Sequence, residues 1–298
     1  MGVQAIEWLT PTAHLLLSAD MSGGVKLWDV LDHKQQVGVF RSHAKAITSL
    51  TTTRKGDRFS TASYDGTIRV WDVEVAAVSE TLHCPGDQEA YCRVHKFHPR
   101  DENSHLILSG IERKVLLWDL RSGNVVREYD RHLSSIMSLT FFDSTGAKFI
   151  STAEDKTIRT WDFNVPVQIQ VFADAALHAV PHIVAHPTDH SFIAQSLNNE
   201  AFILQLSQRN NSLKFNKDRK FVGHLVSGTS CSVAVSRDGQ FVSSGDVNGQ
   251  LHIWSYGTGE KVKSFRAHGK QLVQHLWHPH DPTLVATSSW DGNIKLWS

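Results

Sequence analysis

Short segments that alternate between apolar and polar residues follow one another along the whole chain. In one unit they occupy residues 46–50, 58–63, 67–71 and 78–82. A period of two places neighbouring side chains on opposite faces of a sheet, so each segment predicts a β-strand with one buried face. The turn sequences Lys55-Gly56-Asp57 and Tyr64-Asp65-Gly66 separate these strands. The pattern therefore predicts four antiparallel strands in each unit, and no amphipathic helical segment competes with them.

The third segment of most units ends in an apolar run followed by Trp and then Asp or Ser. It reads Val25-Lys26-Leu27-Trp28-Asp29 in the first unit and returns at residues 68–72, 115–119, 158–162, 251–255 and 294–298. A degenerate fifth unit has Leu204 at the Trp position, and the seven anchors lie 43 to 50 residues apart. A repeat of roughly 40–45 residues with a Trp-Asp signature is typical of the WD-repeat β-propeller, in which each unit forms a four-stranded blade. We predict an all-β, seven-bladed WD-repeat β-propeller that forms one domain across residues 1–298.

The last unit stops at its third strand. Trp297 and Ser298 end that strand, and only Met1 and Gly2 precede the first strand of the first blade. We therefore expect the seventh blade to contain three strands of this chain and to leave residues 293–297 unpaired at its edge. An unpaired edge favours pairing with another strand, from a partner or from an upstream region. Failing that, we expect a loosened junction between the first and seventh blades.

Three units carry the same polar set around the Trp anchor. The sets are His43, Thr61, Asp65 and Trp71; His132, Ser151, Asp155 and Trp161; and His268, Thr287, Asp291 and Trp297. In WD-repeat proteins such residues form a buried hydrogen-bond network, because a buried imidazole needs a partner for each nitrogen. The residue types would also fit a Ser-His-Asp catalytic triad. An enzyme needs one such site, whereas this set recurs in three blades, so we predict structural tetrads, no catalytic residue and no enzyme.

The remaining units depart from the tetrad at the Asp position. They have Ser22, Glu112, Asn198 and Asn248 there. We expect apolar packing to hold these blades and expect them to be softer than the other three.

Composition limits the classes of partner. Lys and Arg together number 30, as do Asp and Glu, so the formal net charge is zero. A nucleic-acid-binding domain usually shows a strongly basic balance, so any RNA contact would have to be a local patch. Cys84, Cys92 and Cys231 have no paired spacing, which favours a reducing, intracellular setting. The sequence contains no apolar run long enough for a membrane span and no signal-peptide pattern, so we expect no membrane partner.

The 18 histidines raise the question of a metal site. His275, His278 and His280 are close in sequence, but Trp277-His278-Pro279 repeats a turn also present at residues 97–99 and 185–187. Strand alternation points His275 and His278 to opposite faces, which leaves too few convergent ligands for zinc. We interpret the segment as a surface turn and predict no metal and no cofactor. The glycine-rich segments at 22–24 and 257–259 precede no helix, so no phosphate-binding loop or small-molecule substrate is indicated.

Loops at one end of the propeller are candidate partner-binding positions. The residue before each turn Asp should project there, and the seven positions hold Met21, Tyr64, Ile111, Glu154, Leu197, Val247 and Trp290. Exposed aromatic side chains dominate interface hot spots, so Tyr64 and Trp290 are the leading anchors. The alternative is that each side chain merely covers its own turn.

A second candidate is the longer interval between the fifth and sixth anchors. It carries the basic residues Arg209, Lys214, Lys217, Arg219 and Lys220. A solvated, charged strand edge that discourages aggregation explains these residues. A phosphate-facing patch on a protein that lies against RNA explains them as well.

The irregular segments between the repeats add a resemblance. They include Glu128-Tyr129-Asp130-Arg131-His132-Leu133, Val165-Pro166-Val167 and the degenerate fifth blade, followed by Phe221-Val222-Gly223-His224-Leu225 and Trp277-His278-Pro279-His280. In these segments and in their order, the chain resembles the WD-repeat domain of the pre-mRNA-processing factor seventeen family, essentially end to end. Members of that family carry a long region ahead of the propeller, which is absent from this sequence.

The resemblance implies a nuclear, non-catalytic spliceosome component that supports exon ligation, the second step of splicing. Its partners would be other spliceosomal proteins, with small nuclear RNA and intron RNA nearby. Two other classes of function stay open. A generic WD-repeat adaptor, such as a ubiquitin-ligase substrate receptor or a chromatin scaffold, would co-purify with different partners. A propeller enzyme would need one cluster of acids, bases or metal ligands at the channel mouth, and the sequence indicates none.

Overall fold

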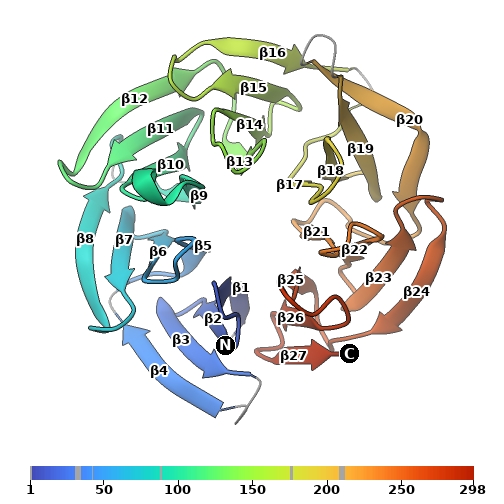
Figure 1. Ribbon diagram of the computed structural model, residues 1–298, viewed down its shortest axis with the longest axis horizontal. Coiled ribbons are helices and arrows are strands. Elements are labelled where there is room, and N and C mark those ends of the chain that lie inside the picture. The colour runs from blue at the N-terminus through green and yellow to red at the C-terminus, as the bar shows by residue number, and fades with distance from the viewer. Residues whose placement is uncertain (1, 31–34, 42, 88, 175–176, 208–211) are drawn as a thin grey trace.

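Seven antiparallel β-sheets stand around a central axis like the blades of a propeller (Figure 1). The computed structural model describes residues 2–30, 35–41, 43–87, 89–174, 177–207 and 212–298, without the side chain of Lys217. Within these residues the helical content is a single 3₁₀ turn, Asp101–Asn103. None of the helices in the described ranges is long and apolar enough to cross a membrane. The predicted all-β, seven-bladed architecture is confirmed.

The chain builds the blades in order, each from the axis outward. Blade 1 contains β1 (Val3–Leu9), β2 (Leu15–Asp20), β3 (Gly24–Asp29) and β4 (Gln35–Arg41), and blade 2 contains β5 (Ile47–Thr52), β6 (Arg58–Ser63), β7 (Thr67–Asp72) and β8 (Ala77–His83). Blade 3 contains β9 (Cys92–Phe97), β10 (Leu106–Ile111), β11 (Lys114–Asp119) and β12 (Asn124–Asp130), and blade 4 contains β13 (Ile136–Phe141), β14 (Lys148–Ala153), β15 (Ile158–Asp162) and β16 (Gln168–Phe172). Blade 5 contains β17 (His182–Ala185), β18 (Ser191–Ser196), β19 (Glu200–Leu206) and β20 (Leu213–Val222), and blade 6 contains β21 (Val233–Val235), β22 (Phe241–Gly245), β23 (Gln250–Ser255) and β24 (Lys261–Arg266). Blade 7 contains β25 (Leu272–Trp277), β26 (Val285–Ser289) and β27 (Ile294–Trp297).

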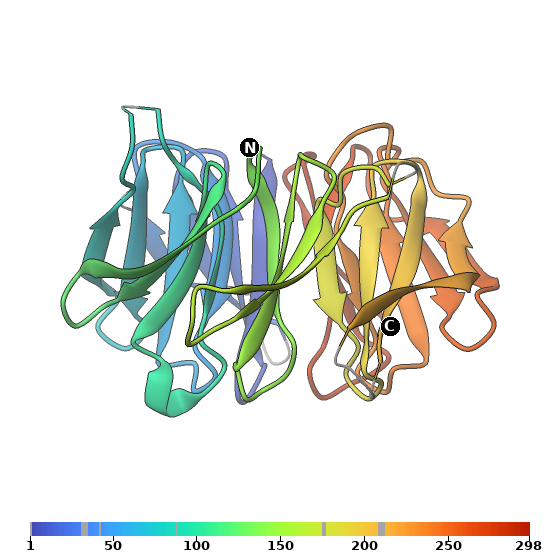
Figure 2. The ribbon, with the colours of Figure 1, turned by 90° about the horizontal axis from the view of Figure 1, so that it is seen from above.

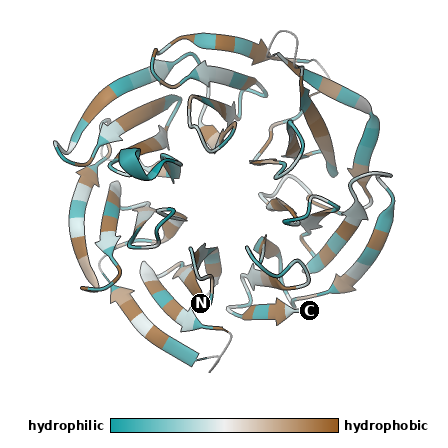
Figure 3. Cartoon of the chain, viewed as in Figure 1, coloured by the Kyte–Doolittle hydropathy of each residue, from teal (hydrophilic) through white to brown (hydrophobic). Residues whose placement is uncertain are grey.

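Burial falls from the axis to the rim of each blade. The second strands are almost wholly buried, as in β6 and β14, because sheets cover both of their faces. The outer strands β8 and β12 instead alternate between exposed and covered residues. The same alternation of hydrophilic and hydrophobic residues runs along the rim in Figure 3. Period-two segments therefore became rim strands, whereas the second strands are buried on both faces even where, as in β6, several of their residues are small and polar.

The apolar core is divided among the junctions between blades. In the described residues each of the seven junctions holds its own cluster, for example Phe40 of blade 1 with Phe59 and Trp71 of blade 2. The rings of Phe40 and Trp71 lie 5.7 Å apart in an edge-on arrangement. Burying large aromatic side chains dominates the apolar contribution to stability, so each Trp anchor stabilises a junction as well as its own blade.

Polar bonds between the innermost strands reinforce five junctions. A side-chain acceptor of one blade receives the backbone N–H of the residue that follows the matching position in the next blade. The described pairs are Ser49 with His95, Ser138 with Ile183, His182 with Val233, Ser232 with His275, and Gln274 with Ile6, at N-to-acceptor distances of 3.4, 3.3, 3.4, 3.0 and 2.9 Å. The last pair joins blade 7 to blade 1 and so closes the ring at its centre. The corresponding positions Ala5 and Val94 are apolar.

The repeated His-Pro turns join blades near the opposite end of the inner strands. His186 Nε2 lies 2.9 Å from the carbonyl oxygen of Gly239 in blade 6, and His278 Nε2 lies 3.0 Å from that of Ala13 in blade 1. Both rings are buried, so the expectation of a surface turn is wrong for the side chains. The reason is that each imidazole leans onto the turn of the following blade, which excludes water from it.

Blade 7 has three strands in the described residues, as predicted, and β27 is its outermost strand. No ribbon lies outside β27 in Figure 1, whereas an outer strand covers the third strand of every other blade. The junction of blades 7 and 1 is nevertheless packed, with Ile6, Trp8 and Leu16 against Ala286. The rings of Trp8 and His278 also pack edge-on, with their centres 4.7 Å apart.

Candidate interaction surfaces

The three sequence-predicted tetrads each come together as one hydrogen-bond network. In blade 2, His43 Nδ1 lies 2.8 Å from Asp65 Oδ2, and His43 Nε2 lies 2.8 Å from Thr61 Oγ1. Trp71 Nε1 donates to the same hydroxyl at 2.9 Å. Blades 4 and 7 repeat these contacts with His132, Ser151, Asp155 and Trp161, and with His268, Thr287, Asp291 and Trp297.

Burial and hydrogen bonding fix the proton positions in the tetrad. Burial lowers the pKa of His43 and outweighs the neighbouring Asp65, so the imidazole is neutral. Burial of Asp65 opposes its ionisation, but hydrogen bonds from Thr67, His43 and the Ala44 backbone hold its pKa below the usual range. A neutral ring can donate from Nδ1 to the carboxylate and accept from Thr61 at Nε2.

The tetrad geometry matches the pairwise contacts of a hydrolase triad but leaves no access to the hydroxyl. Thr61, Ser151 and Thr287 are fully buried. Each hydroxyl also accepts a Trp N–H, which ties its oxygen into the network as well as its proton. The networks therefore hold strands and turns together.

Two blades that depart from the tetrad carry an Asp two residues earlier. Asp20 accepts the backbone N–H groups of Ser22 and Gly24 in blade 1. Asp246 accepts those of Asn248 and Gln250 in blade 6 and also pairs with His252 at 3.1 Å. Each carboxylate accepts backbone N–H groups of the turn that follows it, so the turn stays capped. Sequence reasoning missed both, although the signal Asp-x-Ser/Asn-Gly is present in each.

The loops at one end of the ring gather the proposed partner-binding positions. This end carries the start of β1, where the chain begins in Figure 2. The turn between the second and third strands bonds there to the start of the first strand, as in Tyr64 N to Ala46 O and Trp290 N to Gln271 O. We call this end the loop face.

Tyr64 and Trp290 are half-exposed on the loop face, with 48% and 41% of their surface open to solvent. Tyr64 rests on Tyr91, with the ring centres 4.5 Å apart, and Trp290 donates its indole N–H to Gln4 at 3.1 Å. Each aromatic ring therefore contacts the protein on one side and is open to solvent on the other. Beside Tyr91 lies a recess of about 550 Å³ whose lining includes Asp87, Glu89 and Glu112.

The other predicted positions on the loop face differ from Tyr64 and Trp290 in their exposure or their contacts. Met21 is exposed, but Ile111 is buried in the junction of blades 2 and 3, so the expectation that it projects is wrong. Its strand β10 continues to that residue, and the turn begins only at Glu112, which has a φ of +49°. Glu154 projects, but its carboxylate forms an ion pair with Arg93 at 2.5 Å and is therefore engaged within the chain.

Two exposed leucines on the loop face were not anticipated. Leu133 is 81% exposed and Leu225 is 45% exposed. Each follows a buried histidine, His132 or His224, in the connection that enters a new blade. The His-Leu pair that recurs at these two connections could have identified both leucines from the sequence. With Met21, Tyr64 and Trp290, these leucines distribute exposed apolar groups around the loop face.

The basic segment of the fifth blade forms the rim strand β20. Lys214 and Lys220 are exposed, and Lys220 pairs with Glu200 at 3.0 Å. Arg219 instead donates to the carbonyl oxygen of Tyr256 at 2.9 Å and lies over that ring. Arg209 and the side chain of Lys217 lie outside the described residues.

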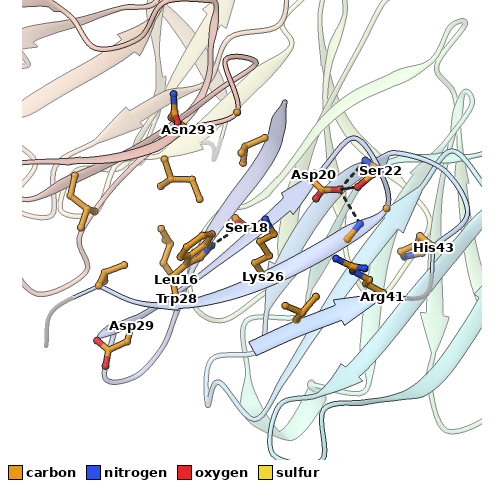
Figure 4. A pocket seen from close by; sticks show the side chains of 18 residues that line it. Leu16, Ser18, Asp20, Ser22, Lys26, Trp28, Asp29, Arg41, His43 and Asn293 are labelled. Atoms are coloured by element: carbon orange, nitrogen blue, oxygen red, sulfur yellow. Dashed lines mark hydrogen bonds between the residues drawn. The ribbon is translucent and has the colours of Figure 1, made fainter. Parts of the chain in front are cut away.

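A groove of about 1060 Å³ lies between blades 7 and 1 (Figure 4). Its apolar lining includes Leu16, Trp28, Val30, Ile294 and Leu296. Trp28 donates to Ser18 at 2.8 Å, and its ring faces the groove. The open edge of β27 forms the opposite wall.

The clustered histidines of blade 7 point apart. His275 contacts Ser232 and Ser243 of blade 6, at 3.0 and 2.8 Å, whereas His278 turns to Ala13 of blade 1. Among the described residues no group of three or more His, Cys, Asp or Glu side chains could hold a metal ion.

One protein-family model and several curated proteins match this chain. The WD40 family model (WD domain, G-beta repeat) matches residues 34–72, 123–162, 215–255 and 259–298. Each matched segment contains an outer strand, or part of one, and the first three strands of the next blade. The sequence repeat is therefore offset by one strand from the structural blade.

The chain is also similar over 99% of its length to several curated proteins. It is 35% identical to "Pre-mRNA-processing factor 17" of Homo sapiens over 297 residues and 33% identical to that of Saccharomyces cerevisiae over 303 residues. It is 26% identical to "WD repeat-containing protein 25" of Mus musculus over 306 residues. The chain covers 50%, 64% and 55% of these proteins, respectively.

Proposed function

Because the chain belongs to the WD40 (WD domain, G-beta repeat) family and is similar throughout to pre-mRNA-processing factor 17, we propose that it is a splicing factor. In this proposal it is a nuclear, non-catalytic spliceosome component that promotes the second step, exon ligation. The observation that carries the proposal is the similarity over 99% of the chain, which includes the divergent fifth blade as well as the Trp anchors.

The geometry supports a scaffold role for the propeller. Its Ser/Thr-His-Asp sets are buried within blades, so the reactive hydroxyls are closed to substrates. The loop face instead offers Tyr64, Trp290 and Leu133, side chains that gain free energy when a partner removes them from water. The ring would hold spliceosomal proteins in fixed relative positions while the RNA core performs the chemistry.

Basic residues along the outer strands of blades 5, 6 and 7 support a position of the propeller close to RNA. Lys214 and Lys220 on β20 are followed around the rim by Lys261, Lys263 and Arg266 on β24 and by Lys295 on β27, all exposed. Asp218 is the acidic residue of these three strands. Clustered cations contact phosphate groups without reading sequence, so this rim would face the backbone of small nuclear RNA or intron RNA. The interaction would weaken steeply as the salt concentration rises.

Depletion from a splicing extract tests the proposed step. We expect the free upstream exon and the lariat intermediate to accumulate, because branching would proceed and exon ligation would stall. Adding back the purified protein should restore the spliced product. Accumulation of unspliced precursor would place the protein at an earlier step and contradict the proposal.

Replacement of Tyr64 and Trp290 tests whether the loop face binds spliceosomal partners. The Tyr64→Ala/Trp290→Ala double variant should bind spliceosomes at least tenfold more weakly, since hot-spot anchors cost about 2 kcal/mol or more on truncation. Its melting temperature should change little because both side chains are half-exposed. Val75→Ala, at a 71% exposed position away from the loop face, serves as the control. A large fall in melting temperature with unchanged association would mean that the two rings only cover their turns.

A further inference from the structure

The recess of about 550 Å³ beside Tyr91 on the loop face has an acidic lining. It contains the side chains of Asp87, Glu89 and Glu112. The lining also contains Arg93, but this guanidinium already forms an ion pair with Glu154, with 2.5 Å between nitrogen and oxygen. The recess therefore carries an excess of negative charge, and we call it the acidic recess.

The three carboxylates of the acidic recess have no partner within the part of the chain that the structure describes. Asp87, Glu89 and Glu112 are exposed, and no side-chain hydrogen bond or ion pair engages them there. Carboxylates held close together without a counter-charge repel one another, so a cation that enters between them is attracted. Charge complementarity therefore makes the occupant positive.

The arrangement of the carboxylates favours an organic cation over a metal ion. Asp87 and Glu89 lie in the connection between β8 and β9, whereas Glu112 lies in the turn between β10 and β11. Across the described ranges, His, Cys, Asp and Glu side chains form no group of three or more that could hold a metal ion. The recess is instead within the range of about 300–1,000 Å³ that is typical of pockets for larger ligands.

An aromatic pair stands at the acidic recess and narrows the choice of cation. Tyr91 belongs to the lining and contacts Tyr64, with the ring centres 4.5 Å apart and the ring planes at 47°. The face of an aromatic ring attracts a cation, and the planar guanidinium of arginine also stacks on it, unlike the compact ammonium of lysine. The guanidinium can further donate to two carboxylates at once. The lining therefore matches arginine best.

An exposed leucine adjoins the acidic recess. Leu133 is 81% exposed and lies two residues before Ser135, which belongs to the lining. The Leu133 backbone N–H donates to Asp155 at 2.9 Å, so the position of this residue is fixed by the tetrad of blade 4. An apolar side chain next to the arginine of a partner could pack on Leu133 and leave water.

We propose that the acidic recess binds an arginine side chain of an extended segment of a partner protein. The guanidinium lies against Tyr91 and between the carboxylates, and an apolar residue beside the arginine packs on Leu133. The inference rests on the proposed use of the loop face for partner binding and names the chemistry of that partner. RNA does not fit this site, because the carboxylates repel phosphate groups.

Fluorescence anisotropy with labelled peptides tests the proposal on the purified 298-residue chain. The first probe contains three Arg-Leu pairs separated by glycines, and two matched probes carry lysine or glutamate in place of arginine. We expect saturable binding of the arginine probe, binding of the lysine probe that is roughly threefold to tenfold weaker, and none of the glutamate probe. Added salt should weaken the binding, because it screens the charges.

Matched removal of charge locates the site. Glu89→Gln/Glu112→Gln should bind the arginine probe at least about tenfold more weakly, because two of its carboxylate partners are lost. Glu74→Gln/Glu260→Gln removes the same charge from exposed turns at the other end of the blades and should bind as wild type. Thermal melting of both variants checks that they fold.

Two substitutions of Tyr91 separate the ring from the charges. Tyr91→Phe keeps an aromatic face and should bind the arginine probe within about twofold of wild type. Tyr91→Leu keeps an apolar side chain without that face and should bind roughly threefold to tenfold more weakly. Equal affinity of these two variants would contradict the stacked guanidinium.

Three further results would overturn the proposal. They are failure of the arginine probe to bind, equal weakening in the recess and control variants, and stronger binding of a single-stranded RNA that the recess variant abolishes. The peptide assay contains no splicing reaction. Peptide binding in a protein whose depletion leaves splicing intact would contradict only the proposed function, and failure to bind in a protein needed for exon ligation would contradict only the arginine site.

Discussion

Single histidine residues join neighbouring blades while remaining uncharged. Burial lowers the pKa of His275 to about 4 and those of His95 and His182 to about 3. His275 uses both ring nitrogens, toward Ser232 and Ser243, and thereby connects blade 7 to blade 6. A proton on this ring would add charge where burial disfavours it, so the interior of the ring is sensitive to acid.

The free energy of unfolding should fall between about pH 6.5 and pH 4. In that range the unfolded chain binds a proton at residue 275 and the folded chain does not. A shift from 6.5 to about 4 corresponds to a loss on the order of 3 kcal/mol for this residue. Above pH 6.5 neither state is protonated there and the effect vanishes.

Urea unfolding at several pH values measures this loss. His275→Gln should flatten the slope of unfolding free energy against pH, and His83→Gln, at an exposed position of β8, should keep the wild-type slope. An unchanged slope in His275→Gln would mean that this residue does not cause the pH dependence of the unfolding free energy.

At the scale of the element, blades with a tetrad differ from blades without one. Asp155 accepts both the His132 ring and the Leu133 backbone N–H, at 2.9 Å each. The tetrads could be predicted because the repeat spacing aligned their residues. Asp20 and Asp246 were missed, because their two-residue shift breaks the alignment of the repeats and only the local Asp-x-Ser/Asn-Gly signal reveals them. Ile111 was misplaced for a related reason, since spacing alone does not fix where a strand ends.

Asp155→Ala should lower the free energy of unfolding by about 1–3 kcal/mol, because it removes the carboxylate that accepts from both the buried His132 ring and the Leu133 backbone N–H. Asn248→Ala, at the same position of blade 6, should change it by less than about 0.5 kcal/mol, because Asn248 is exposed. Equal losses in the two variants, measured by urea unfolding, would mean that the tetrad adds nothing beyond turn geometry.

For the whole molecule, the sequence predicted the number and order of the blades but not how neighbouring blades bind. The Trp period counts blades without regard to contacts between them. The bonds from Ser49, Ser138 and Gln274 to the next blade depend on which inner strands face each other. That relation exists only after the ring has closed. The His-Pro turns were recognised as turns, yet their buried contacts with the next blade follow from the same closure.

Gln274→Leu should lower the free energy of unfolding by about 1–3 kcal/mol, since it leaves the Ile6 N–H without its acceptor where the two ends of the ring meet. Limited proteolysis of this variant should begin in blade 1 or blade 7. Gln36→Leu, on the exposed rim of blade 1, is the control and should behave as wild type. Initial cleavage in a distant blade would contradict the role of this bond.

The inner bond between Gln274 and Ile6 separates two tasks that an outer strand usually combines. The bond holds the inner strands of blades 7 and 1 together at the axis, so this part of the junction does not depend on contacts at the rim. Opening of the rim between blades 7 and 1 would therefore leave the two ends of the ring joined at the hub.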